Sequence, residues 1–166
     1  MAWHVGRTCT ALALGLALGT ATACSPPLGR AVGLTRDGDV LTVLTPLCER
    51  GELGLISVSE YDSEEPHQWR AHQPWGSGLG GVRSFPLFTA PPGWTVDSTT
   101  LTALRPGPLY FLTVTHSGSD AKESRLGFTV ADVERLQPGE VLAKGHGGKT
   151  VVLSVKEFRA KALDDC

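Results

Sequence analysis

Short apolar runs, each about as long as one strand, alternate with turn-forming residues along most of the chain. Residues 31–45 hold two such runs on either side of Asp37-Gly38, a dipeptide that favours the tight turn of a β-hairpin. Residues 52–62 alternate between apolar and polar side chains, which is the pattern of a strand buried on one face. A shorter run at 67–71 predicts another strand. This part of the sequence therefore predicts four strands and no helix.

The second half of the chain continues the pattern. Glycine and proline interrupt residues 72–86, which predicts a long loop. Residues 83–96 are at best an edge strand, because Pro86 has no N–H to donate to a neighbour. Further apolar runs predict strands at 99–104, 108–116, 125–130 and 150–155.

Helix is expected at two places near the C-terminus. The run at 131–142 begins with a single helical turn at most. Ser154 and Glu157 form the S-x-x-E pattern of a capping box, in which each side chain accepts a hydrogen bond from a backbone N–H at the start of a helix. A short C-terminal helix follows, with Phe158 on its apolar side, and brings Cys166 back to the body of the domain.

Eight or so short strands with almost no helix predict a mainly β fold. The architecture we expect is a two-sheet antiparallel β-sandwich, immunoglobulin-like in arrangement, with a short C-terminal helix and a single domain over residues 31–166. The same pattern also permits a partly open barrel. The Cys…Trp…Cys spacing of a true immunoglobulin domain is missing from the sequence, so the likeness concerns architecture alone.

The N-terminal segment has the pattern of a secretory signal peptide, which we place at residues 1–23. A short start containing Arg7 precedes the apolar, uncharged run Thr8–Gly19. That run is too short to cross the roughly 30 Å hydrocarbon core of a bilayer as a stable helix. The signal ends in small residues directly before Cys24.

The sequence Ala21-Thr22-Ala23-Cys24 resembles the lipobox of bacterial lipoproteins. The resemblance implies that Cys24 is lipidated, with acyl chains such as palmitate, and becomes the first residue of the mature protein. Two or more acyl chains give stable anchoring at the outer face of the cell membrane. Residues 24–30 then form a short tether. The alternative is an ordinary signal cut by the general peptidase, which leaves Cys24 unmodified and the domain freely secreted.

The sequence is also similar to small secreted proteins of actinobacteria. It contains no Asn and uses Arg more than Lys, as proteins from GC-rich genomes do. From about Pro91 onward, the order of "PPGW", "YFLTV" and "PGEVL" carries the resemblance. It implies a β-rich envelope domain with a cysteine crosslink at its C-terminus, and it brings no activity with it.

Two cysteines remain after Cys9 leaves with the signal and Cys24 takes lipid. In an exported domain we expect Cys48 and Cys166 to form a disulfide bond that pins the C-terminus. The alternative is a pair of free thiols, which an oxidising exterior disfavours. A redox site is not expected because the sequence has no CxxC.

The charge balance excludes some partners. Removal of residues 1–23 from the 166-residue chain leaves 143 residues, and the loss of Arg7 changes the formal net charge from −2 to −3. This balance is slightly acidic and shows no basic stretch, which argues against nucleic acid as a partner.

No catalytic, cofactor or metal motif stands out. The mature histidines lack the spacing of a metal site within one element, the glycines of "WGSGLGG" do not match a nucleotide-binding loop, and Ser77 lies in G-S-G rather than G-x-S-x-G. We therefore expect no cofactor and no metal. An envelope hydrolase whose site assembles from distant loops is the alternative to a non-catalytic protein.

The one feature that favours binding is aromatic. Trp75 lies among glycines and prolines with no apolar neighbour in the sequence, and exposed tryptophan is enriched where proteins contact other molecules. Trp75, Phe85 and Phe88 are therefore the candidate binding residues, with burial of Trp75 in the core as the equal alternative, whereas Trp69 and Trp94 are expected in the core. The predicted function is a membrane-anchored lipoprotein of the cell envelope that binds an envelope protein or glycan, or serves a neighbouring complex as a structural accessory.

Overall fold

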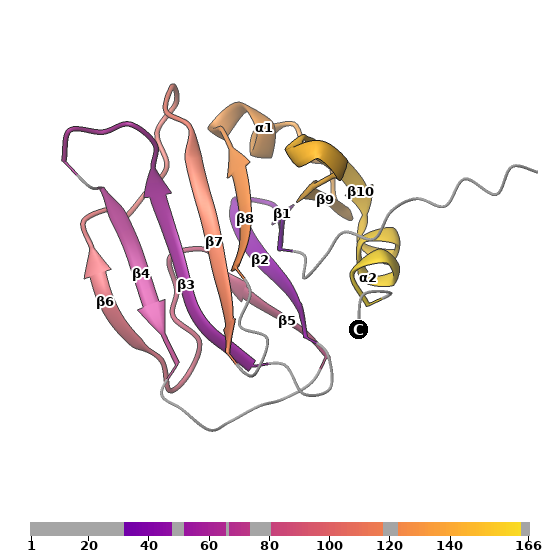
Figure 1. The fold of residues 1–166 in the computed structure, drawn as a ribbon. Coiled ribbons are helices and arrows are strands. Elements are labelled where there is room, and N and C mark those ends of the chain that lie inside the picture. The colour runs from indigo at the N-terminus through magenta and orange to yellow at the C-terminus, as the bar shows by residue number, and fades with distance from the viewer. Residues whose placement is uncertain (1–31, 48–51, 66, 74–80, 118–122, 164–166) are drawn as a thin grey trace, which may run out of the picture.

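The computed structural model describes residues 32–47, 52–65, 67–73, 81–117 and 123–163. Ten strands form two antiparallel five-stranded sheets, which confirms the predicted two-sheet β-sandwich (Figure 1). The first sheet has the order β10-β9-β1-β2-β5, with β1 Gly33–Asp37, β2 Val40–Leu47, β5 Gly81–Pro86, β9 Glu140–Lys144 and β10 Thr150–Ser154. The second has the order β6-β4-β3-β7-β8, with β3 Glu52–Glu60, β4 Gln68–His72, β6 Thr95–Thr99, β7 Tyr110–Ser117 and β8 Glu123–Phe128.

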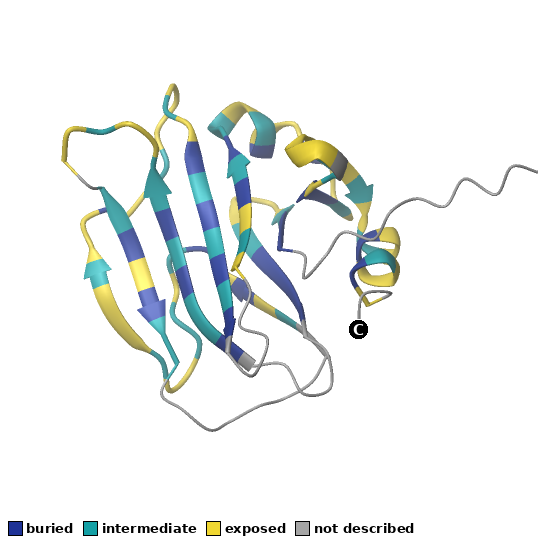
Figure 2. Ribbon diagram, in the orientation of Figure 1, coloured by how far each residue is buried: buried dark blue, intermediate teal, exposed yellow. Residues whose placement is uncertain are grey.

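The main core lies between the two sheets. Alternate residues of the central strands point into it and are fully buried, as the striping of β3 and β7 in Figure 2 shows. Burying one such aliphatic or aromatic side chain contributes about 1.5–3 kcal/mol. The buried set includes Leu34, Val43, Ile56, Val58, Trp69, Leu112, Val114, Leu126 and Phe128.

A second, smaller core lies between the first sheet and the C-terminal helix α2, Val155–Leu163. Phe158 and Ala162 are buried against Leu44 and Val141. Gly33 permits this contact: a Cβ atom at that position would lie 2.5 Å from Cγ1 of Val141 and 3.1 Å from the ring of Phe158. The predicted helix and its buried Phe158 are thereby confirmed.

Both α-helices begin with a capping box. In α1, Val130–Glu134, Oγ1 of Thr129 accepts a hydrogen bond from the Asp132 N–H, and the Asp132 carboxylate accepts one from the Thr129 N–H at 2.9 Å. Ser154 and Glu157 make the same reciprocal pair before α2. A single turn of 3₁₀ helix, η1 (His146–Gly148), links β9 to β10. Within the described ranges, no helix is long and apolar enough to cross a membrane.

The connection into β7 is fixed by a buried tyrosine. The Tyr110 hydroxyl donates a hydrogen bond to the Arg105 carbonyl at 3.2 Å and accepts one from the Arg105 N–H at 3.0 Å. This is the tyrosine corner seen in many Greek-key sandwiches, where a tyrosine at the start of a strand binds backbone a few residues upstream. It holds the loop over residues 100–109 against the end of the sheet.

Two sequence predictions about elements were wrong, and one strand was not predicted. The loop predicted for 72–86 contains β4's last residue and, from Gly81 onward, the edge strand β5, which pairs with β2. The strand predicted at 99–104 is instead a connection. The strand in this region, β6, ends at Thr99, and Leu101 leaves the sheet to bury its side chain. The strand that was not predicted, β9, follows Pro138-Gly139 and pairs with both β1 and β10.

Candidate functional site

The segment from Arg83 to Trp94 lines two surface pockets. The first, which we call the Trp94 pocket, has a volume of about 410 Å³. Its walls come from the end of β4, from β5 and from the loop before β6. They are formed by Gln73, Arg83, Ser84, Phe85, Pro91, Pro92 and Trp94.

A tight turn positions Trp94. Pro92 and Gly93 occupy its two central positions, Gly93 has a φ of 82°, and the Trp94 N–H donates to the Pro91 carbonyl at 3.1 Å. Proline second and glycine third is the residue preference of a type II turn, because only glycine adopts that positive φ without strain. The "PPGW" sequence therefore places the indole directly before β6, where it is half-buried against the core.

The chemistry of the Trp94 pocket combines an aromatic and prolyl surface with side chains that form hydrogen bonds. Ligand pockets of several hundred Å³ usually have this composition, with apolar walls and a few polar groups that fix orientation. Gln73 supplies an amide, Arg83 a guanidinium and Ser84 a hydroxyl. The arrangement suits a ligand with both a flat apolar face and hydroxyl groups, such as a sugar ring.

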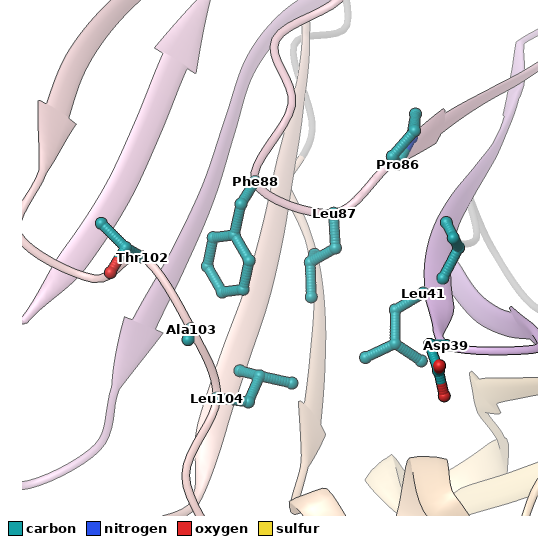
Figure 3. A pocket seen from close by; sticks show the side chains of 9 residues that line it. Asp39, Leu41, Pro86, Leu87, Phe88, Thr102, Ala103 and Leu104 are labelled. Carbon is teal, nitrogen blue, oxygen red and sulfur yellow. The ribbon is translucent and has the colours of Figure 1, made fainter.

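The second, the Phe88 pocket, has a volume of about 350 Å³ (Figure 3). Its floor is formed by Leu41, Leu87, Phe88 and Leu104, whose side chains converge in Figure 3. Its rim contains Asp39, Val40, Pro86, Thr102 and Ala103.

Phe88 has an unusual backbone conformation for a bulky residue. Its φ is 63°, and the Thr89 N–H donates to the Pro86 carbonyl at 3.1 Å, so Phe88 takes the turn position that usually belongs to glycine. Strain of this kind costs on the order of 1–3 kcal/mol. The Phe88 ring packs edge-on against Trp69, with the ring centroids 6.2 Å apart, and this contact offsets part of that cost.

The candidate binding residues predicted from the sequence have different surroundings in the structure. Phe85 is only 6% exposed and belongs to the main core, so its side chain offers little surface to a partner. Phe88 is half-buried and lines a pocket. Trp69 is buried, as expected, whereas Trp94 both packs against the core and lines a pocket. Trp75 lies outside the described residues, as do Cys24, Cys48 and Cys166.

The turn sequence before Trp94 is a signal for its position beside a pocket. "PPGW" predicts a turn, and a large aromatic residue that directly follows a tight turn stands at the end of a strand, where one side of its ring faces solvent. The pocket also needs Gln73 and Arg83, which lie on opposite sides of the 74–80 segment, and no sequence pattern indicated their closeness.

One histidine pairs with a carboxylate. His72 Nδ1 lies 2.9 Å from Oδ1 and 3.0 Å from Oδ2 of Asp97, and Nε of Arg70 lies 3.6 Å from the same carboxylate. His116 is buried. Across the residues that the structure describes, no group of three or more histidine, cysteine, aspartate or glutamate side chains could hold a metal ion.

Comparison with known proteins adds no family: no protein-family model, no curated protein and no solved structure matches this chain.

Proposed function

We propose that this protein is a membrane-anchored lipoprotein of the cell envelope that acts as a non-catalytic binding module. The observation that carries the binding role is the Trp94 pocket. It joins an aromatic surface to hydrogen-bonding groups, and two of its walls, at Gln73 and at Arg83, flank the segment that contains Trp75. Its ligand is an envelope component, and the composition of the walls favours a glycan.

The anchor in this proposal is a lipid on Cys24. The described domain begins at Val32, directly before β1, so few residues separate the lipid from the sandwich. Six extended residues span about 18 Å at roughly 3.1 Å each. The domain would therefore lie close to the membrane, where envelope polymers attached near the surface are within its reach.

The crosslink in this proposal joins Cys48 to Cys166. Helix α2 packs against β2 and β9. Strand β2 ends at Leu47, one residue before Cys48, and α2 ends at Leu163, three residues before Cys166. The packing of these two elements supports the pairing.

The intact mass of protein extracted from its native membrane tests both modifications. We expect a chain that starts at Cys24 with added lipid and that gains two daltons on reduction. A lipid-free chain would refute the anchor, and an unchanged mass on reduction would refute the disulfide.

Binding is tested by sedimentation with protease-treated, insoluble cell-wall material, which keeps glycan and removes protein partners. We expect Trp94→Ala to reduce the bound fraction at least tenfold, because the ligand loses its stacking surface. Trp75→Ala tests the neighbouring segment in the same assay. The control is Val152→Ala, which removes an exposed apolar side chain on β10, at the opposite edge of the first sheet from β5.

A thermal melt of each variant separates lost binding from lost folding. Trp94 packs against the core, so Trp94→Phe is added as a variant that keeps an aromatic ring there. Retention of wild-type binding by a folded Trp94→Ala variant would rule out the pocket as the binding site.

An envelope hydrolase remains the second candidate, and the His72–Asp97 pair favours it. A carboxylate on Nδ1 orients an imidazole and supports Nε2 as a general base. If this function is correct, His72→Gln abolishes hydrolysis of envelope polymers, and Asp97→Asn lowers it by orders of magnitude. If both variants degrade the same polymers as the wild type does, this candidate is rejected.

A further inference from the structure

The outer face of the second sheet has an ordered pattern of side chains that the Trp94 pocket does not explain. Along β3 and β7, the residues between the buried ones point outward and are half-exposed. In Figure 1 the strands β6, β4, β3 and β7 lie side by side with no helix in front of them. We call this surface the outer face. Its members include Ser57, Ser59, Arg70, Phe111, Thr113 and Arg125.

The strand register places four of these residues in one row across the sheet. Arg70 pairs with Ser57, Ser57 pairs with Thr113, and Thr113 pairs with Arg125. Neighbouring strands are about 4.8 Å apart, so the two arginine positions are separated by roughly 14 Å, with two hydroxyl groups between them. The row therefore combines two guanidinium groups with two hydroxyls on one face of the sheet.

An aromatic cluster adjoins one end of the row. The Arg125 guanidinium carbon lies 3.6 Å from the centroid of the Phe111 ring, and Tyr61 packs edge-on against the same ring at 5.5 Å. Gly127, opposite Phe111, leaves room for the ring, since a Cβ there would lie 3.0 Å from it. Tyr61 is 58% exposed, so the cluster presents aromatic surface to solvent.

The stacked Arg125 is available to an anion. Within the described part of the chain it forms no ion pair, whereas Arg36, Arg105 and Arg135 each pair with a carboxylate. Stacking holds the guanidinium plane still and leaves its N–H groups at the edge free to bind a carboxylate in a bidentate way. At the other end of the row, Arg70 is 48% exposed and shares Asp97 with His72.

We propose that the outer face binds an acidic polysaccharide, a polymer of sugars that bear carboxylate groups. The two arginines would bind acidic groups on separate sugar units, the serine and threonine hydroxyls would exchange hydrogen bonds with sugar hydroxyls, and Phe111 and Tyr61 would contact the apolar faces of sugar rings. Asp97 lies beside Arg70 and Glu123 lies on the same side of β8 as Arg125, so the attraction is local to the guanidinium groups and strongest at Arg125, which has no ion pair among the described residues. A peptide would instead use a sheet edge or a groove, where its backbone can pair.

The test uses the full-length protein in detergent and immobilised polymers at low salt. Polygalacturonate is the acidic glycan, dextran is the neutral glycan, and poly-L-glutamate is an acidic polymer without sugars. We expect binding to polygalacturonate at least tenfold tighter than to either of the others. The double variant Arg70→Gln/Arg125→Gln should weaken that binding at least tenfold.

Two controls keep this proposal separate from the Trp94 pocket. Arg159→Gln removes one positive charge from the exposed side of α2, and we expect it to bind polygalacturonate within twofold of the wild type. Trp94→Ala should also keep this binding, because the outer face does not include the pocket. No binding to polygalacturonate, wild-type binding by the double variant, or equal binding to poly-L-glutamate would each overturn the proposal.

Discussion

The two tyrosines of this chain differ sharply at the scale of single residues. Tyr110 is fully buried and its hydroxyl bonds both backbone groups of Arg105, whereas Tyr61 is exposed. We expect Tyr110→Phe to lower the free energy of unfolding by about 1–3 kcal/mol, because it leaves two backbone groups unsatisfied. Tyr61→Phe should change it by less than about 0.5 kcal/mol. Urea denaturation measures both, and equal effects would show that the tyrosine corner does not stabilise the fold.

Phe88 permits a measurement of its own backbone strain. Phe88→Ala and Phe88→Gly both remove the ring that packs on Trp69, but only glycine relieves the positive φ. We expect the glycine variant to be more stable than the alanine variant by about 1 kcal/mol, as judged by chemical denaturation. Greater stability of the alanine variant would mean that the turn relaxes once the ring is lost.

The burial of single residues was predicted correctly where the alternation of neighbouring residues alone determines which side chains point inward. Trp69 is inward because it alternates with polar Gln68 and Arg70 on a short strand. Phe85 was expected to bind and instead fills the core, since the strand that carries it was predicted as a long loop or, at best, an edge strand. Once a segment is assigned to a loop, alternation no longer indicates which side chains point inward.

At the scale of elements, the two capping boxes make helix stability depend on pH. Burial opposes ionisation of Asp132, but the hydrogen bonds from Thr129 and the guanidinium of Arg135 outweigh it and lower the pKa of the carboxyl below its ordinary value of 3.8. Hydrogen bonds from the hydroxyl and N–H of Ser154 lower the pKa of Glu157 in the same way. The folded state therefore binds these protons less readily than the unfolded chain does.

The stabilisation from Asp132 is complete above the ordinary pKa and is lost as the pH falls through the depressed value. We expect the unfolding free energy of the wild type to decline below about pH 4, and this decline to be shallower in Asp132→Asn. Glu134→Gln, on the same helix but outside the capping box, is the control. Urea denaturation at pH 7, 4 and 3 measures the slopes, and parallel slopes in Asp132→Asn and the wild type would contradict the prediction.

Sequence predicted elements well where turn chemistry and apolar period agreed. The hairpin of β1 and β2 turns at Gly38, whose φ is 58°, and the Ser154–Glu157 pair marked the start of α2. The connection that follows β6 was mistaken for a strand at 99–104 because threonine and leucine alternate there. In the structure the Leu101 N–H donates to the Gln68 carbonyl, and the chain then leaves the sheet. This departure depends on tertiary contacts, which the alternation of apolar and polar residues does not indicate.

At the scale of the whole molecule, the proposed crosslink joins distant parts of the chain. A disulfide between Cys48 and Cys166 would close a loop of more than 100 residues, which corresponds to about 4–5 kcal/mol at most. We expect Cys48→Ser, Cys166→Ser and the double variant to lose the same stability in chemical denaturation. Additive losses would show that each cysteine acts independently and that no bond joins them.

The two-sheet architecture could be predicted from the spacing of the strands, but the order in which strands pair within each sheet could not. The first sheet places β9 beside β1, although about a hundred residues separate them in sequence, and β10 then pairs with β9. The period of apolar residues identifies the buried face of a strand, but it does not indicate which strand, distant in the sequence, lies next to it in the sheet. The two pockets and the outer face depend on that pairing, which is why single-sequence reasoning reached the candidate site only in part.

The position of β1 has a consequence for the order of assembly. It is an interior strand with β2 on one side and β9 on the other. Its backbone groups on the β9 side therefore stay unpaired until β9 has been synthesised. The first sheet, and the small core under α2, cannot close while the polypeptide is still being synthesised. The proposed export would benefit from this delay, because an unfolded chain passes through a translocation channel more readily than a folded domain.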